Sequence, residues 1–169
     1  PVLCWAVGRI SEDSSLDEVI DDLNKARADP FKIWEDAYIA LEAQDKQVLQ
    51  GIVAFPRDTS RDALVWVTGL ELDNVRRSLS RLVSSGMVNT NQALHEKDKR
   101  YSLYNQVRNY LQNRMTASRR DWIVLYNKAE DYLVEFCQQN GREQWDRYPL
   151  INAEMDNLQA LFQILELQK

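Results

Sequence analysis

Apolar residues in this chain recur mostly three and four positions apart, in segments separated by polar turns and by single prolines or glycines. This spacing is typical of amphipathic α-helices. It predicts helices over residues 1–10, 15–26, 30–41, 47–55, 105–111, 122–141 and 151–165. In the last helix the predicted apolar stripe begins with Ile151, Met155 and Leu158. We expect the last two helices to form an antiparallel hairpin.

A different pattern fills the middle of the chain. Thr59, with Asp62 three residues later, has the form of a capping box that starts a short helix, and Gly69 can end that helix in a left-handed turn. A longer helix then runs from Leu72 to Gly86. Two short extended segments, 88–94 and 100–105, follow on either side of a charged turn.

This order of elements predicts a winged helix. Asn105 is expected to cap the helix that follows it. The fold class is therefore mainly α: a helical bundle, a winged-helix domain with a small two-stranded β-wing, and a C-terminal helical hairpin.

Composition adds limits rather than a function. The 169 residues are 44% hydrophobic, and no apolar run approaches the ~20 residues that a membrane span needs. Residues 1–10 lack the pattern of a signal peptide, so we expect a cytoplasmic protein without a membrane partner. Cys4 and Cys137 are expected to be reduced, buried thiols, and one histidine, His95, offers no metal site.

Charge is unevenly distributed along the chain. The net charge is −5, but residues 61–108 carry 8 basic and 5 acidic side chains, a balance of +3. This segment coincides with the predicted winged helix and keeps nucleic acid among the possible partners. The excess is small for a dedicated DNA-binding domain.

Motifs for catalysis are missing from this sequence. It contains no phosphate-binding loop of the type G-x-x-x-x-G-K-[ST], no G-x-G-x-x-G and no nucleophile elbow. Acidic residues fall on the polar faces of predicted helices. We therefore expect no enzyme activity, no catalytic residue and no metal site in this chain.

One hypothesis assigns DNA binding to the winged helix. Arginines on a helix that fits the major groove can contact guanine edges or phosphates. The candidates are Arg76, Arg77 and Arg81 on the second helix, with Lys97 and Lys99 in the wing. The alternative is a solvated helix face that nearby acidic residues neutralise.

A second hypothesis comes from a family resemblance. The segments 1–8, 34–56, 69–88 and 100–111 resemble, in order, parts of the nucleotide-switch region of the STAND signalling ATPases of NB-ARC type. Ala153-Glu-Met-Asp-Asn-Leu158 resembles a helix start seen where that region gives way to helical repeats. The resemblance implies three parts: the end of a small helical domain (1–29), a winged-helix domain (30–116) and a hairpin leading to repeats (117–169).

The resemblance also implies a function and partners. This chain would be a regulatory, non-catalytic segment that packs on a P-loop domain of a longer ATPase and controls its ADP-closed and ATP-open forms. ATP or ADP with Mg would be the cofactor of the longer protein, which would form a homo-oligomer when activated. DNA would be the less favoured partner.

Nucleotide contacts follow from the same resemblance. Pro1 corresponds to a family proline that lies against adenine. Leu103-Tyr104-Asn105 stands where the family has Met-His-Asp or Leu-His-Asp, so Tyr104 and Asn105 are the other candidate nucleotide contacts. Tyr104 cannot carry the imidazolium charge of the family histidine. An aromatic side chain packed beside the wing is the alternative.

Overall fold

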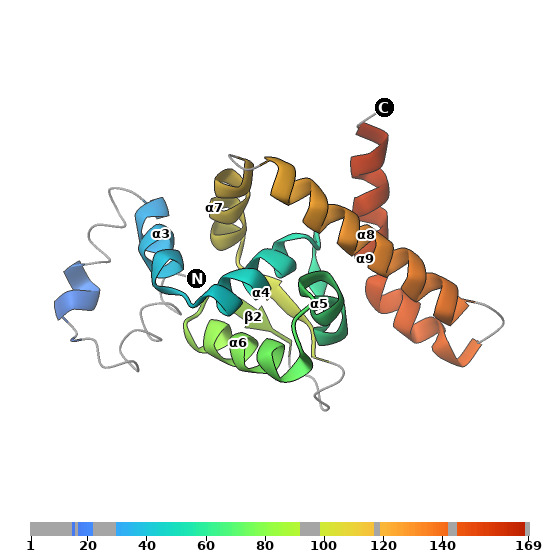
Figure 1. The fold of residues 1–169 in the computed structure, drawn as a ribbon, viewed down its shortest axis with the longest axis horizontal. Coiled ribbons are helices and arrows are strands. Elements are labelled where there is room, and N and C mark those ends of the chain that lie inside the picture. Colours follow the sequence, from blue (N-terminus) through green and yellow to red (C-terminus); the bar gives the residue numbers. More distant parts are fainter. Residues whose placement is uncertain are drawn as a thin grey trace.

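A computed structural model of the chain describes residues 15, 17–21, 30–91, 99–116, 119–141 and 145–167. In chain order from residue 30 the elements are α3 (Pro30–Ala40), α4 (Ala43–Val53), β1 (Asp58–Thr59), α5 (Arg61–Thr68), α6 (Leu72–Ser84), β2 (Val88–Thr90), β3 (Tyr101–Leu103), α7 (Asn105–Thr116), α8 (Arg119–Gly141), the 3₁₀ helix η2 (Trp145–Arg147) and α9 (Tyr148–Leu167). Figure 1 shows α4, α5, α6 and the sheet in the middle, with α3 on one side and α8 and α9 on the other.

The predicted fold class is confirmed: the chain is mainly helical, with a small antiparallel sheet and the arrangement of a winged helix. The predicted two-stranded wing is incomplete, because the sheet has three strands in the order β1-β3-β2. β3 is the central strand, and its Tyr101 pairs with Thr59 of β1 and with Thr90 of β2. A two-residue strand such as β1 is too short to leave a pattern in the sequence.

The capping box predicted from Thr59 is also corrected. Thr59 is fully buried in β1, where its β-branched side chain suits a strand. Ser60 is the residue that caps α5: it has an extended backbone, and its hydroxyl accepts a hydrogen bond from the Ala63 N–H at 3.2 Å.

The N-terminus of α7 differs by one residue from the prediction. The carbonyl of Tyr104 accepts the first helical hydrogen bond, from the Arg108 N–H at 2.9 Å. Tyr104 therefore holds the N-cap position, and Asn105 is the first helical residue.

The main hydrophobic core lies between the winged helix and the helices that flank it. Its members come from α3, α4, α5, α6, the sheet and α7, so these elements share one core. The largest fully buried side chains in it include Trp34, Leu49, Ile52, Leu64, Leu82 and Leu111.

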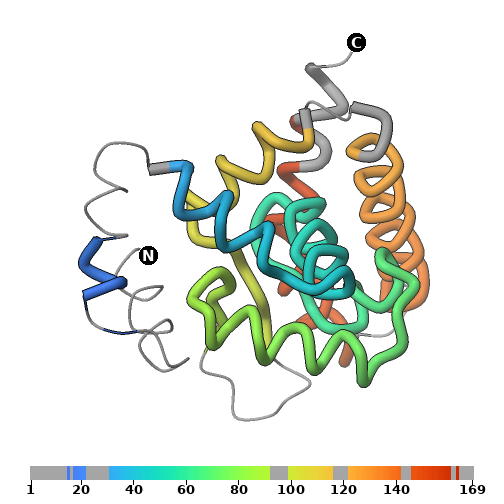
Figure 2. Tube along the Cα trace, turned by 60° about the vertical axis from the view of Figure 1, so that its left-hand side comes forward, coloured from blue at the N-terminus to red at the C-terminus, as the bar shows by residue number. Residues whose placement is uncertain are grey.

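A second cluster joins α5 to the C-terminal hairpin. Phe55 and Val67 on the winged-helix side pack with Tyr132 and Leu133 of α8, and Leu158 of α9 packs against them. Figure 2 shows α8 running beside α5. The apolar stripe predicted for residues 122–141 is confirmed, since Ala129, Tyr132 and Leu133 are buried.

The stripe predicted for α9 is wrong in part. Met155 is 38% exposed, whereas Glu154 and Asn157 are each only 1% exposed. These two polar side chains face the sheet, where they find charged and backbone partners.

Other predictions fall outside the described residues or stay predictions. Pro1 and Cys4 lie outside them, as does most of the predicted helix pair at residues 1–26. The division at residues 29 and 116 stays a prediction. In the described parts of the chain, no helix combines the length and the apolar character that a membrane span requires.

Candidate nucleic-acid interface

α5 and α6 form a helix-turn-helix whose turn is held from both sides. Gly69 has a φ of 71°, a left-handed conformation that glycine adopts without strain. Thr68 donates its hydroxyl to the Leu64 carbonyl at 2.6 Å and accepts from the Leu70 N–H at 3.2 Å. Gln47 of α4 donates to the Thr68 carbonyl at 2.7 Å. These bonds fix the direction in which α6 leaves the turn.

α6 has one buried face and one exposed face. Val75, Leu79 and Leu82 are buried against α4, α5 and the sheet. Its exposed residues are Leu72, Asp73, Arg76, Arg77, Ser80, Arg81 and Ser84. A helix of 13 residues is roughly 20 Å long, and its width with side chains matches the ≈ 12 Å major groove of B-DNA. The exposed face of α6 can therefore enter that groove.

Arg81 of α6 forms an ion pair with carboxylates at the start of α4. Its guanidinium donates from Nε to Asp45 Oδ2 at 2.8 Å and from one Nη to Asp45 Oδ1 at 2.6 Å, and it reaches Glu42 at 3.1 Å. The Asp45 hydrogen bond raises the pKa of Arg81 above its usual value, against the effect of desolvation. Asp45 is buried at the start of α4, so this pair ties α6 to α4. Arg81 therefore differs from Arg76 and Arg77 on the same exposed face, because its guanidinium is paired with a buried carboxylate of another helix.

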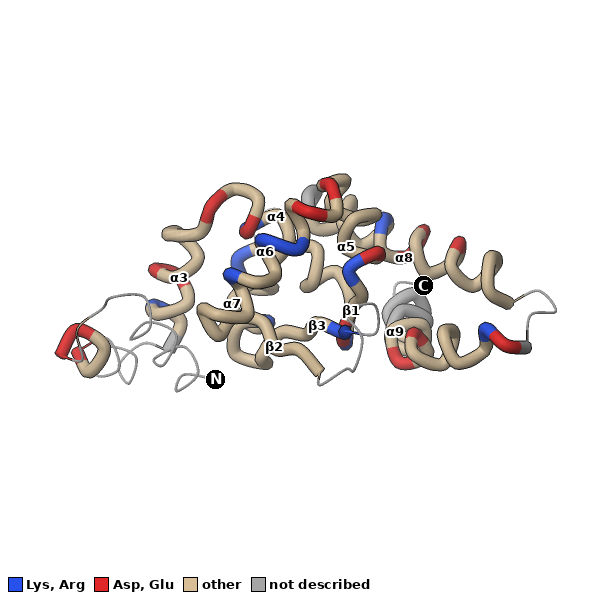
Figure 3. Tube along the Cα trace, turned by 90° about the horizontal axis from the view of Figure 1, so that it is seen from below, with Lys and Arg blue, Asp and Glu red and all other residues tan. Residues whose placement is uncertain are grey.

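A pocket of about 320 Å³ lies between α6, the start of α5 and the wing strands. Three basic residues line it from three separate elements: Arg61 of α5, Arg76 of α6 and Lys99 just before β3. Its other lining residues are Leu79, Ser80, Val83, Ser84, Thr90 and Tyr101. Figure 3 shows basic positions on α6, at the start of α5 and at the start of β3.

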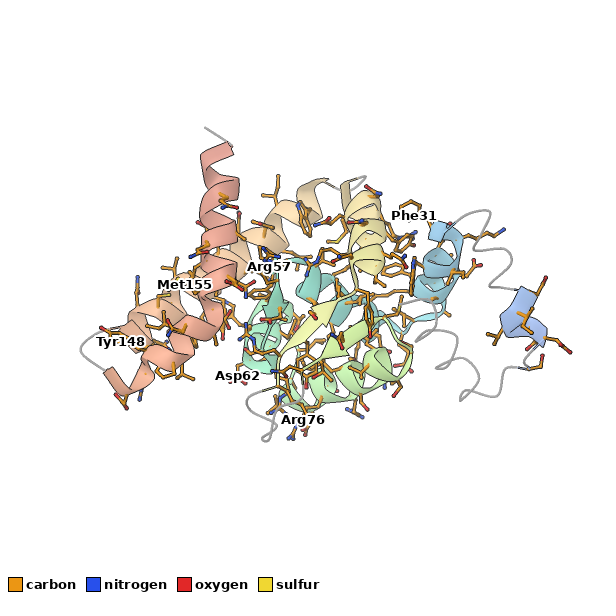
Figure 4. The ribbon with its side chains drawn as sticks, turned by 180° about the vertical axis from the view of Figure 1, so that it is seen from behind. Phe31, Arg57, Asp62, Arg76, Tyr148 and Met155 are labelled. Carbon is orange, nitrogen blue, oxygen red and sulfur yellow. The ribbon has the colours of Figure 1, made fainter. Side chains whose placement is uncertain are left out.

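The pocket has the chemistry of a phosphate site. Guanidinium and ammonium groups form strong, charge-assisted hydrogen bonds with phosphate oxygens, and hydroxyl groups add donors. Figure 4 labels Asp62 of α5 and Arg76 of α6 along the same edge of the molecule, and these two helices are in contact.

Arg76, which lines the pocket, and its neighbour Arg77 both contact residues of their own helix. Arg76 lies 3.8 Å from Asp73, and both side chains are at least half exposed. Arg77 donates to Asn74 Oδ1 at 2.6 Å. Exposed pairs of this kind contribute roughly 0–1 kcal/mol, so a phosphate can replace the carboxylate.

Arg61 is the member that sequence reasoning missed. It is the first residue of α5, after the Ser60 cap. The only signal in the sequence is a basic residue directly after a capping serine. Its position beside Arg76 and Lys99 depends on tertiary structure.

The other predicted site residues lie elsewhere. Lys97 and Pro1 are outside the described residues. Tyr104 is half-buried and packs against the main core, and Asn105 is exposed at the start of α7. Their contact with a nucleotide stays a prediction, as does ATP or ADP with Mg as a cofactor of a longer protein. Among the residues that the structure describes, no group of His, Cys, Asp or Glu could hold a metal ion.

Comparison with known proteins gives structural similarities only. No protein-family model matches the chain, and no curated protein matches it. Among solved structures, the MarR family transcription regulator SP03579 is similar at a TM-score of 0.39 and 12% identity, over 95% of this chain and 99% of that chain. The organohalide-sensing transcriptional regulator RdhR-CbdbA1625, bound to 2,4-dichlorophenol, is similar at 0.39 and 12%, over 88% and 82%. RV1404 from Mycobacterium tuberculosis is similar at 0.38 and 13%, over 88% and 95%.

These comparisons overturn the predicted family. The identification as a STAND ATPase of NB-ARC type is wrong: no NB-ARC family model matches the chain, and two of the similar solved structures are transcription regulators. The predicted ADP/ATP switch and the predicted P-loop domain as an intramolecular partner depended on that identification and are wrong as well. ATPase activity of a longer protein has no support. Similarities with TM-scores below 0.5 assign neither a family nor a ligand to this chain.

Proposed function

We propose that this chain is a winged-helix DNA-binding module of a transcriptional regulator. α6 lies in the major groove, and a backbone phosphate occupies the pocket between α6 and the wing. The observation that carries this proposal is the convergence of Arg61, Arg76 and Lys99 on that one pocket.

The exposed face of α6 is the sequence-reading surface in this proposal. Arg77 and Asn74 are hydrogen-bonded neighbours on α6. Arginine can pair with the O6 and N7 atoms of guanine, and asparagine can pair with adenine. The phosphate pocket, at the edge of the same face, fixes the register of α6 along the groove.

Acidic side chains limit the strength of binding. Glu71 and Asp73, at the start of α6, are exposed and repel phosphate. We therefore expect weak binding to random sequence and a larger gain from the correct base sequence.

Fluorescence anisotropy with a labelled pool of random-sequence duplexes tests the proposal. Binding should weaken steeply as salt rises, because phosphate contacts release counterions. Combining Arg76→Ala with Lys99→Ala should reduce the slope of log K against log salt by about two, one for each lost phosphate contact.

A matched control removes two exposed arginines outside the pocket. Arg114→Ala combined with Arg147→Ala changes the net charge by the same amount and should leave the slope unchanged. Failure of the unmodified chain to bind duplex at low salt would overturn the proposal. An equal loss of slope in the control pair would overturn the assignment of the pocket.

A further inference from the structure

A buried ionic network joins α9 to the sheet of the winged helix. Arg100, the residue before β3, donates to both carboxylate oxygens of Glu154 of α9, at 2.9 Å for the Oε2 bond. It also donates to Asp58 of β1 at 2.9 Å. The Glu154 side chain is 2% exposed and that of Arg100 is 15% exposed. Water therefore contributes little to the solvation of either charge.

Asn157 of α9 completes the network. Its amide donates to the Asp58 carbonyl at 2.7 Å and to Glu154 Oε2 at 2.8 Å, while its Oδ1 accepts from the Arg57 N–H at 3.0 Å. Figure 4 shows Arg57 close to α9. The contact between α9 and the sheet is thus specified by hydrogen bonds to particular atoms of the β1 segment and Arg100.

The backbone of the same arginine is hydrogen-bonded to Asn91, which follows β2. The Arg100 N–H donates to Asn91 Oδ1 at 2.8 Å, and the Arg100 carbonyl accepts from the Asn91 N–H at 3.2 Å. Lys99 and Tyr101, on either side of Arg100 in the chain, both line the phosphate pocket. Tyr101 pairs in the sheet with Thr90, which also lines the pocket.

The position of Arg100 therefore affects two parts of the molecule. Its guanidinium is hydrogen-bonded to Glu154 of α9. Its backbone connects Lys99 and Tyr101, so the position of Arg100 affects the positions of these two lining residues. Loss of the Glu154 contact removes one of the restraints on Arg100 and leaves its contacts with Asn91 and Asp58 to hold this part of the chain.

We propose that Glu154 is a positioning residue for DNA binding: through Arg100 it holds Lys99 in the pocket, so that the seating of α9 sets the affinity for a backbone phosphate. This inference rests on the proposed function. It makes α9, which contributes no lining residue to the pocket, a control element of the DNA-binding face. Duplex affinity is high with α9 seated and low with α9 displaced.

The test is a thermodynamic cycle on the whole chain with the same duplex pool. Glu154→Gln keeps the shape of the side chain and one acceptor oxygen but removes its charge. It should weaken duplex binding and reduce the slope of log K against log salt by about one, the effect expected for one lost phosphate contact. If Glu154 acts through Lys99, combining Glu154→Gln with Lys99→Ala should weaken binding no further than Lys99→Ala alone.

Arg77→Ala provides the matched comparison. Arg77 is outside the network, so its effect and that of Glu154→Gln should multiply. Two results would overturn the inference. The first is a duplex affinity that Glu154→Gln leaves unchanged. The second is a Glu154→Gln variant that lowers affinity by the same factor in the Lys99→Ala background as in the Arg77→Ala background. Either result would mean that Glu154 only stabilises the fold.

A second readout separates this inference from the proposed function. If the unmodified chain binds no duplex, the proposed function fails, and amide hydrogen exchange then decides whether Glu154 positions the strand. Glu154→Gln should speed exchange in β3 and at Thr90 more than it speeds exchange in α4. Unchanged exchange in β3 would overturn the positioning role. Asn157→Ala, which weakens the same network, should give the same pattern and replaces Glu154→Gln if that variant does not fold.

Discussion

Lys99 and Arg100 are neighbours in the chain, yet they belong to two regions with opposite properties. Lys99 lines an open pocket with Arg61 and Arg76, and no carboxylate is among the lining residues. Arg100 is enclosed by two carboxylates, and its hydrogen bonds with Glu154 and Asp58 outweigh the effect of burial and raise its pKa above the usual value. Lys99 is therefore placed where an anion can reach it, whereas the Arg100 guanidinium is buried against Glu154 and Asp58.

The comparison shows that the role of a basic residue depends on what covers it. In a buried pair, removal of one partner leaves an uncompensated charge in a poorly solvated site. In an open pocket, removal of one charge affects the ligand more than the fold. Substitutions in the two regions should therefore change different measurements.

The largest expected effect is on stability in the enclosed region. Glu154→Ala should lower the free energy of unfolding by about 3 kcal/mol, because Arg100 loses its most buried partner. Chemical denaturation followed by circular dichroism measures this change.

An exposed pair supplies the control for that prediction. Glu35 and Arg114 lie 3.5 Å apart with side chains about half exposed, and Glu35→Ala should cost less than about 1 kcal/mol. Similar losses for Glu154→Ala and Glu35→Ala would show that the α9 network does not behave as a buried pair.

The helices and turns of the winged helix could be predicted because their signals are local. Gly69 and Gly86 have positive φ angles at the ends of the two predicted helices. The buried residues of α6 and α8 follow the helical spacing of apolar residues. Spacing of this kind depends only on neighbours within one element.

The candidate site could be predicted only in part, because it depends on contacts between distant residues. The sequence places Arg76 and Arg81 on one helix, but only Arg81 meets Asp45, 36 residues away in the chain. The burial of Glu154 depends in the same way on Arg100, 54 residues away. No helical pattern predicts a buried glutamate, so the sequence pattern assigned the inward position to Met155 instead. A partner of opposite charge on another element decides which of these residues is buried.

A smaller effect is expected at the pair that joins α6 to α4. Arg81→Ala should lower the free energy of unfolding by about 1–3 kcal/mol, since Asp45 stays buried without its main partner. Duplex affinity should change less than twofold once the measurement is made well below the unfolding temperature. Arg77→Ala, on the same helix, should show the reverse: little change in stability and weaker duplex binding. A larger affinity loss for Arg81→Ala than for Arg77→Ala would return Arg81 to the DNA-binding surface.

The smallest expected effect concerns a buried polar group without a partner. The Tyr126 hydroxyl is buried and has no hydrogen-bond partner among the described residues, and burial raises its pKa to about 12, partly opposed by the charge of Arg108. Tyr126→Phe removes this hydroxyl and should leave stability unchanged or raise it by up to about 1 kcal/mol at neutral pH.

The effect of Tyr126 on stability should also depend on pH. The unfolded chain releases the tyrosine proton near its ordinary pKa of about 10, while the folded chain keeps it to about pH 12. The unmodified protein therefore loses stability between these values as pH rises, and the advantage of Tyr126→Phe should grow over the same interval in denaturation experiments. An advantage that stays constant with pH would show that the Tyr126 hydroxyl is solvated in the folded chain.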